Sequence, residues 1–121
     1  MSGFGCLEDI EVWQEARAFA GDIYDISSKP PFSRDFSLVD QIRRAGNSIS
    51  LNIAEGFGLF SDREFGRHLT IARGSTLEVK GALYLAFDQS YIDEKTLDEM
   101  KKKSERLARR ISSLMKYLAK G

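Results

Sequence analysis

Apolar residues in this 121-residue chain recur at steps of three and four along four separate segments. Such spacing places them on one face of an α-helix. The residues that share these faces are Trp13, Ala16, Ala20 and Ile23; Leu38, Ile42, Ala45, Ile49, Ile53 and Phe57; Phe65, Leu69, Ala72, Thr76, Val79, Leu83 and Ala86; and Leu97, Met100, Ser104, Leu107, Ile111, Leu114 and Leu118. No segment alternates apolar and polar residues over a useful length, so we expect almost no strand.

Turn and capping residues set the expected ends of the helices. The adjacent Pro30 and Pro31 exclude helix from the one long connection. Asp9, Ser37 and Ser61 are candidate N-caps, and Glu64 stands at the spacing from Ser61 that a capping box requires. We therefore expect helices over about 9–27, 37–57, 61–89 and 93–120. Together they predict a single all-α domain over 1–121, an antiparallel up-down-up-down four-helix bundle.

The charge of the chain is balanced overall but uneven along its length. Lysine and arginine number 18, as do aspartate and glutamate, so the chain lacks the excess of cations typical of a protein that depends on phosphate contacts. Residues 1–40 hold eight acids and three bases, whereas residues 93–121 hold nine bases and five acids. This polarity favours ion pairs between the first and last helices, and steering of a partner is the alternative.

Cysteine usage and hydropathy point to the cytoplasm. Cys6 is the one cysteine, so it forms no internal disulfide, and its place near the terminus argues against a nucleophile. No apolar run approaches the roughly 20 residues of a membrane span. The N-terminus lacks the basic and then apolar layout of a secretory signal. We expect a cytoplasmic protein without membrane contact.

A stripe of polar residues lies directly beside the apolar face of the second helix. It comprises Gln41, Ser48, Asn52 and Glu55, with Arg44 at its outer edge. Amides and hydroxyls at a core boundary cost about 1–3 kcal/mol each when they lack a hydrogen-bond partner, so we expect other groups to hydrogen-bond with this stripe. The third helix adds Gly74 and Gly81 opposite its apolar face, where each glycine costs roughly 1 kcal/mol relative to alanine. Hydrogen-bonded ion pairs of Arg44, Asn52 and Glu55 that set the register of helices within or between subunits explain the stripe. Close approach by another chain explains the glycines, and a tolerated, mobile helix without a partner is the alternative for them.

Several runs of residues resemble a known family. They are Leu7-Glu8-Asp9-Ile10-Glu11-Val12-Trp13-Gln14-Glu15-Ala16, Gln41-Ile42-Arg43-Arg44-Ala45, Asn52-Ile53-Ala54-Glu55-Gly56 and Ala72-Arg73-Gly74-Ser75. The chain thereby resembles the 23S rRNA intervening-sequence proteins, a four-helix-bundle family first noticed as reading frames within insertions of large-subunit ribosomal RNA genes. The resemblance implies a bacterial protein that assembles into a ring-shaped homopentamer. Ser50 departs from a proline common in relatives, and Leu59 and Phe60 replace arginine, which favours a protein contact at this corner.

Two sets of cations are candidates for phosphate contacts when repeated around a ring. They are Arg43, Arg63, Arg67 and Arg73, and Lys101, Lys102, Lys103, Arg106, Arg109 and Arg110. A solvated charged face is the alternative, because no recognised nucleic-acid motif is present.

An enzymatic reading rests on His68, the only histidine, four residues after Glu64. Such a pair supports proton transfer in a pocket, but a local polar pair is more common. The chain has no Glu-x-x-His motif, phosphate-binding loop or nucleophile elbow, so we expect no catalysis, metal or cofactor. The sequence therefore predicts a non-enzymatic, homo-oligomeric scaffold that binds structured RNA or a ribonucleoprotein. The alternative is a protein-interaction subunit with no nucleic-acid role.

Overall fold

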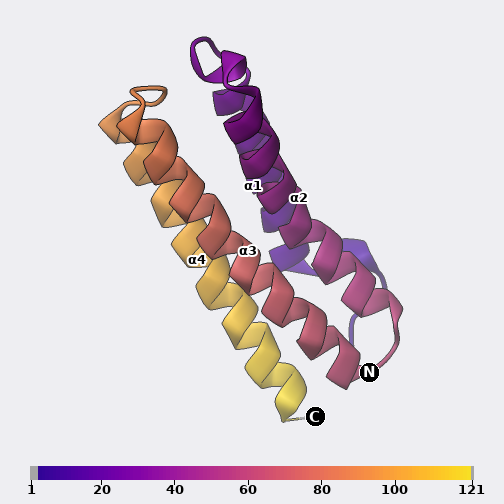
Figure 1. Ribbon diagram of the computed structural model, residues 1–121. Helices are drawn as coiled ribbons and strands as arrows, with labels where there is room; N and C mark the ends of the chain where they lie inside the picture. Colours follow the sequence, from indigo (N-terminus) through magenta and orange to yellow (C-terminus); the bar gives the residue numbers. More distant parts are fainter. Residues whose placement is uncertain (1–2, 121) are drawn as a thin grey trace.

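A computed structural model describes residues 3–120 and contains four long helices (Figure 1). They are α1 (Glu11–Ser27), α2 (Phe36–Gly58), α3 (Asp62–Asp88) and α4 (Glu94–Ala119). Two short 3-10 helices, η1 (Leu7–Asp9) and η2 (Phe32–Arg34), precede α1 and α2. The predicted helices are confirmed to within two residues at each end, and residues 3–120 include no strand.

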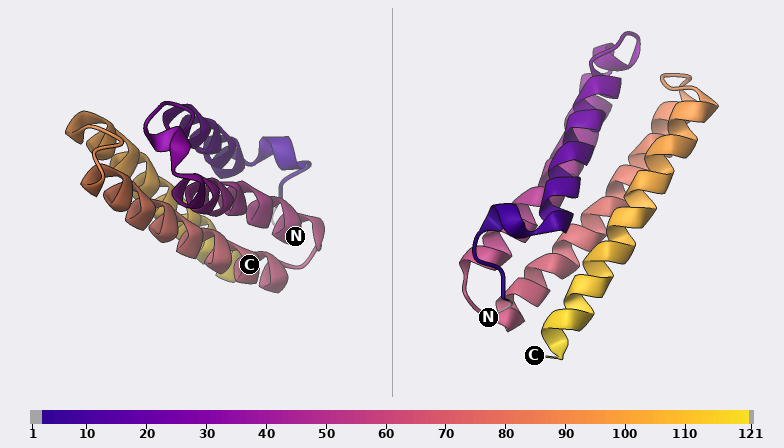
Figure 2. Two further views of the ribbon diagram at one scale, coloured as in Figure 1. Left: turned by 45° about the horizontal axis from the view of Figure 1, so that its top comes forward. Right: turned by 180° about the vertical axis from the view of Figure 1, so that it is seen from behind.

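The helices form an antiparallel bundle whose connections lie at alternate ends (Figures 1 and 2). Each neighbouring pair is joined by side-chain contacts. Tyr24 of α1 accepts from Asn47 of α2, Ser75 of α3 donates to Ser48 of α2, Arg73 of α3 donates to Ser112 of α4, and Arg106 of α4 donates to Glu15 of α1. The predicted all-α bundle is therefore the observed architecture.

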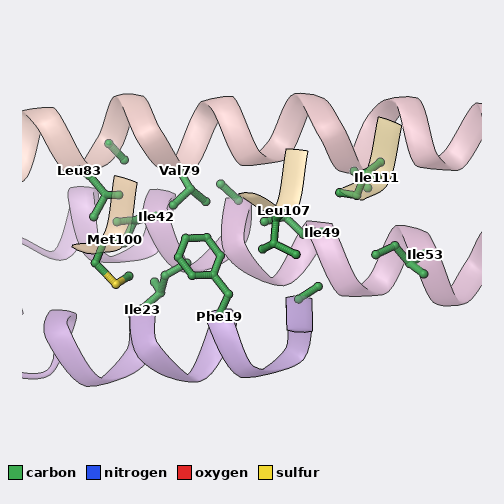
Figure 3. Packing of buried hydrophobic residues seen from close by; sticks show 14 of the residues in the cluster. Phe19, Ile23, Ile42, Ile49, Ile53, Val79, Leu83, Met100, Leu107 and Ile111 are labelled. Atoms are coloured by element: carbon green, nitrogen blue, oxygen red, sulfur yellow. The ribbon is translucent and has the colours of Figure 1, made fainter. Parts of the chain in front are cut away.

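The core contains the apolar faces that the sequence predicts. Figure 3 shows Phe19 and Ile23 of α1 packed among side chains from the other three helices. Of the predicted positions, Trp13, Ala20, Phe57 and Leu114 are only partly buried. Ser104, the one polar residue of the α4 seam, is buried and donates to the carbonyl oxygen of Thr76 at 2.8 Å, so no lost hydrogen bond opposes its burial.

The N-caps of the helices differ in part from the sequence prediction. Asp35, rather than Ser37, caps α2, because its carboxylate accepts from the Leu38 amide at 3.1 Å and so starts the helix at Phe36. The prediction for Asp9 is also wrong, since Asp9 lies within η1 and Ile10, which has no capping side chain, precedes α1.

The capping box at α3 forms only in part. Ser61 accepts from the Glu64 amide at 3.3 Å, as predicted. The Glu64 carboxylate instead accepts from Arg67 at 3.2 Å. Asp93 caps α4 and accepts from the Thr96 amide at 2.8 Å, and this hydrogen bond lowers the pKa of Asp93.

The α1–α2 and α3–α4 connections meet at the upper end of the bundle in Figure 1. The rings of Phe32 and Tyr91 stack with centroids 5.3 Å apart, and Phe32 is fully buried. Tyr91 donates to Asp35 Oδ2 at 3.0 Å, and this hydrogen bond raises the pKa of the tyrosine. The same aspartate therefore caps α2 and holds the two connections together.

Ion pairs between α1 and α4 confirm the pairing interpretation of the uneven charge. Arg106 and Arg110 both bind Glu15, at 2.8 and 2.6 Å, and Arg110 also reaches Glu11 at 3.0 Å. The hydrogen bond with Glu15 is the main cause of the raised pKa of Arg110. Among residues 3–120, no helix is long and apolar enough to cross a membrane.

Candidate functional site

A chain of hydrogen bonds joins α2 to α3 beside the core. Asn52 Nδ2 donates to the carbonyl oxygen and to Oγ of Ser48, at 2.9 and 3.0 Å, and Ser75 Oγ donates to Ser48 Oγ at 2.8 Å. Because the amide nitrogen of Asn52 is used in this way, its Oδ1 accepts from Nδ1–H of His68, 3.0 Å away. His68 is only 8% exposed. The inner residues of the polar stripe thus find their partners within one chain.

Gly56 allows α2 and α3 to approach closely next to this network. A Cβ atom at residue 56 would lie 2.8 Å from His68 Cβ and 3.2 Å from the backbone Cα of Phe65. Asn52 and Gly56, the first and last residues of the Asn-Ile-Ala-Glu-Gly run, therefore both serve the contact with α3. The main role of this run within the chain is therefore to pack α2 against α3.

The outer residues of the stripe point to solvent. Arg44 contacts Asp40 on its own helix at 3.4 Å, and these side chains are 79% and 67% exposed. Gln41 and Arg44 line a polar surface groove of about 520 Å³ together with Glu78 of α3. The Glu55 side chain is 66% exposed. Within one chain Arg44 does not join Asn52 and Glu55 in the expected set of ion pairs; the outer residues are available to a partner.

Exposed apolar residues and glycines lie on α3 and at Leu51 of α2, and we call these residues together the α2–α3 outer face. It consists of Leu51, Ile71, Gly74, Leu77, Gly81 and Leu85. The four large side chains are 46–65% exposed, with Leu51 and Leu77 the most exposed at 65% and 64%. A Cβ atom at Gly74 or Gly81 would meet nothing within 4 Å. The structure therefore brings both predicted glycines to an open apolar surface.

Six of the ten cations considered for phosphate contacts are held by other groups of the chain. Arg106 and Arg110 bind the acids of α1, and Lys103 binds Asp22 at 2.8 Å. Arg67 binds Glu64 at 3.2 Å. Arg43 donates to Ser27 and Ser28 and lies over the Tyr24 ring, and Lys101 lies over Tyr84, which raises the pKa of that lysine through a hydrogen bond.

The other four candidates are exposed and less constrained. Within residues 3–120, no ion pair joins Arg63, Lys102 or Arg109 to a carboxylate, and Arg73 donates only to Ser112, at 3.2 Å. Ser112, Ser113 and Lys116 lie beside Arg109 around a surface depression of about 370 Å³. These three residues were not predicted from the sequence, although their spacing of three, four and seven from Arg109 indicates a shared helix face.

The Glu64 and His68 pair does not form a catalytic dyad. Glu64 binds Arg67, and His68 donates to Asn52, with Glu55 Oε2 3.9 Å from its Nδ1 atom. Cys6 is exposed, and a hydrogen bond with Asp9 raises the pKa of its thiol, which disfavours the nucleophilic thiolate. The described part of the chain contains no cluster of three His, Cys, Asp or Glu side chains arranged to hold a metal ion.

Comparisons with known proteins agree with the fold. The sequence model of the family described as 23S rRNA-intervening sequence protein matches residues 8–113. A crystal structure of a protein with unknown function, assigned to the S23 ribosomal protein family of Bacteroides thetaiotaomicron, superposes with a TM-score of 0.78. The two chains are 26% identical, and the match covers 87% of this chain and 98% of the other. A search of the curated proteins found no match.

Proposed function

Because the chain belongs to the 23S rRNA-intervening sequence protein family, we propose that it is a subunit of a homo-oligomeric scaffold that binds structured RNA. It carries no catalytic role in this proposal and works in the bacterial cytoplasm. The assembly is a pentameric ring, as the family resemblance implies. The scaffold part and the RNA part rest on different surfaces of the chain.

The α2–α3 outer face is the observation that carries the scaffold part. Leu51 and Leu77 are each nearly two thirds exposed, and an apolar surface rimmed by polar residues is typical of a protein contact. Each interior glycine in α3 weakens the helix by roughly 1 kcal/mol relative to alanine. A neighbouring helix that packs closely on Gly74 and Gly81 offsets this loss. Arg44, Glu55 and Glu78 supply charges of both signs with which a second copy can pair.

The mass of the protein in solution tests the scaffold part. Light scattering at micromolar concentration is expected to give a multiple of the 13.7 kDa chain mass, and a fivefold multiple supports the pentamer. A mass equal to that of one chain contradicts the proposal. A mass equal to two or four chains supports a homo-oligomeric scaffold but contradicts a pentameric ring.

The RNA part is favoured by the cations that no carboxylate holds. Arg63 and Arg109 are exposed without an ion pair among the described residues, although the chain as a whole has no net charge. A patch that is weak on one subunit becomes effective when several copies bind one polyanion. RNA is expected to remain bound during purification at low salt, and its affinity should fall steeply as salt rises.

The alternative function is a protein-interaction subunit with no nucleic-acid role. It is favoured by the corner between α2 and α3, where Leu59 is 48% and Phe60 72% exposed. Phe60 also has a φ of 54°, the left-handed region that aromatic residues seldom adopt. If a protein rather than RNA copurifies at low salt, and added RNA shows no salt-dependent binding, this alternative replaces the RNA part.

A further inference from the structure

Helix α4 lies at one edge of the molecule (Figure 1), and exposed cations recur along it at a regular spacing. Lys95, Lys102, Arg109 and Lys116 are all exposed and lie seven residues apart. Seven residues correspond to about 10.5 Å of helix rise, so these side chains form a row on one side of α4. The acids of α1 hold none of these four cations.

The two halves of this row differ in the number of acidic residues near them on α4. Glu94, Asp98 and Glu99 lie on α4 near Lys95 and Lys102, whereas no aspartate or glutamate follows Glu105 in the chain. Glu105, one turn before Arg109, is bound by Lys80 of α3 at 2.8 Å. The second half of the row, from Arg109 onwards, is therefore the part of α4 where an anion meets the least competition.

A surface depression with several hydrogen-bond donors lies in this second half. Its lining includes Arg109, Ser112, Ser113 and Lys116, and its volume is about 370 Å³. Arg73 reaches it from α3, because its Nη1 atom donates to Ser112 Oγ at 3.2 Å. Two guanidinium groups, an ammonium and the Ser112 hydroxyl are groups that commonly bind phosphate oxygens in nucleic-acid complexes. The Ser113 hydroxyl donates to the carbonyl oxygen of Arg109 at 3.1 Å and only lines the depression.

We infer that Arg73, Arg109, Ser112, Ser113 and Lys116 form a seat for the phosphate groups of double-helical RNA. The seat reads the backbone and not the bases, since its residues include no aromatic ring on which an unpaired base would stack. This inference rests on the RNA part of the proposed function and names the residues that carry it. Lys102, at the acidic end of the row, contributes little.

Four of the five seat residues belong to α4, which contributes no residue to the α2–α3 outer face. Ser75 of α3 donates to Ser48 of α2, whereas Arg73 donates to Ser112 of α4. The seat therefore lies on the α4 flank of α3, and the network beside the α2–α3 outer face lies on the opposite flank. Only Arg73 adjoins that outer face, next to Gly74, so copies that assemble through the face keep the α4 part of each seat, and one RNA helix is bound at several points.

Two double variants of the full chain test the seat against a matched control on the same helix. Arg109→Gln with Lys116→Gln removes two charges from the seat, and Lys95→Gln with Lys102→Gln removes two charges from the acidic half of the row. The probe is an RNA hairpin with a duplex of about two helical turns, whose Kd is measured over a series of salt concentrations. The seat variant is expected to raise Kd on the order of tenfold at low salt and to reduce the salt slope by about one for each lost phosphate contact. The control is expected to stay within about twofold of the native protein.

Equal weakening by the two variants overturns the seat, because it would mean that only the overall charge of the chain matters. If neither variant weakens binding of the hairpin, the seat is also overturned, because the RNA then binds to another surface of the chain. Tighter binding to anionic lipid vesicles than to the hairpin would contradict RNA as the occupant. Light scattering of the same samples tests the scaffold separately from the seat. A mass equal to one chain contradicts the scaffold, whereas the difference in Kd between the two variants tests the seat whatever the mass.

Discussion

At the scale of single residues, Gly56 and Gly46 show how the same residue type meets different constraints. A Cβ atom at residue 46 would come within 2.5 Å of Ile23, but only of the Cδ1 atom at the end of its side chain. A Cβ atom at residue 56 would come within 3.2 Å of the Phe65 backbone, which moves only if α3 moves. Gly56 is therefore required by helix packing, and Gly46 is required less strictly.

We expect Gly56→Ala to lower the free energy of unfolding by about 1–3 kcal/mol, because the added methyl group forces α3 away from α2. Gly46→Ala is expected to cost less, since the end of one side chain is displaced more easily than a helix backbone and alanine favours the helix by roughly 1 kcal/mol. Urea unfolding followed by circular dichroism measures both. Equal losses, or a larger loss for Gly46→Ala, would contradict the close contact between α2 and α3 at Gly56.

At the scale of the helices, the α3–α4 pair contains a hydrogen bond whose strength depends on pH. The Lys80 ammonium donates to Glu105 at 2.8 Å, and this bond lowers the pKa of Glu105 below that of an ordinary glutamate. A carboxylate whose pKa is lowered in the folded state stabilises the protein above its unfolded pKa. That stabilisation is lost as the pH falls through the folded value.

Glu105→Gln is accordingly expected to lower the thermal unfolding midpoint at pH 7, and the difference from the native protein should shrink as the pH falls below about 4. The size of the change is small, because both side chains are partly exposed. Glu99→Gln, at an exposed acid on the same helix, serves as control and should show little difference at either pH. A difference for Glu105→Gln that is constant from pH 7 to pH 3 would rule out the Lys80 bond as its cause.

The helices themselves were largely predictable from sequence, because burial of one face imposes a periodicity that the chain displays directly. Ile42, Ile49 and Ile53 are predicted core residues and are fully buried. The caps were less predictable: Asp35 and Ser37 both precede an apolar repeat, and only the backbone path shows that Asp35 reaches the Leu38 amide.

The candidate site was less predictable than the fold, because its chemistry depends on contacts between distant parts of the chain. The need of Asn52 for a partner follows from its position beside the core, but that partner, His68, follows only from the antiparallel pairing of α2 with α3. The run Lys101-Lys102-Lys103 looks uniform in sequence. In the structure Lys101 lies over Tyr84, Lys103 binds Asp22 and Lys102 remains without an ion pair among the described residues.

At the scale of the whole molecule, the glycines of α3 link the stability of one chain to its assembly. Gly74 and Gly81 are exposed and have nothing within 4 Å of a would-be Cβ atom, so no contact among residues 3–120 explains them. Alanine at these two positions should stabilise the isolated chain, by roughly 1 kcal/mol each, because it favours the helix. In a tightly packed interface the same methyl groups keep the neighbouring helix at a distance.

Gly74→Ala combined with Gly81→Ala is therefore expected to have opposite effects on two measurements. The mass from light scattering should shift towards the single chain at a protein concentration where the native assembly persists. The free energy of unfolding of the dissociated chain should rise. Gly21→Ala is the matched control, because Gly21 is also an exposed helical glycine with nothing within 4 Å, but lies on α1. It should stabilise the chain and leave the mass unchanged. If the double variant keeps the native mass, or if Gly21→Ala dissociates the assembly equally well, the α2–α3 outer face is not the surface through which copies of this chain meet.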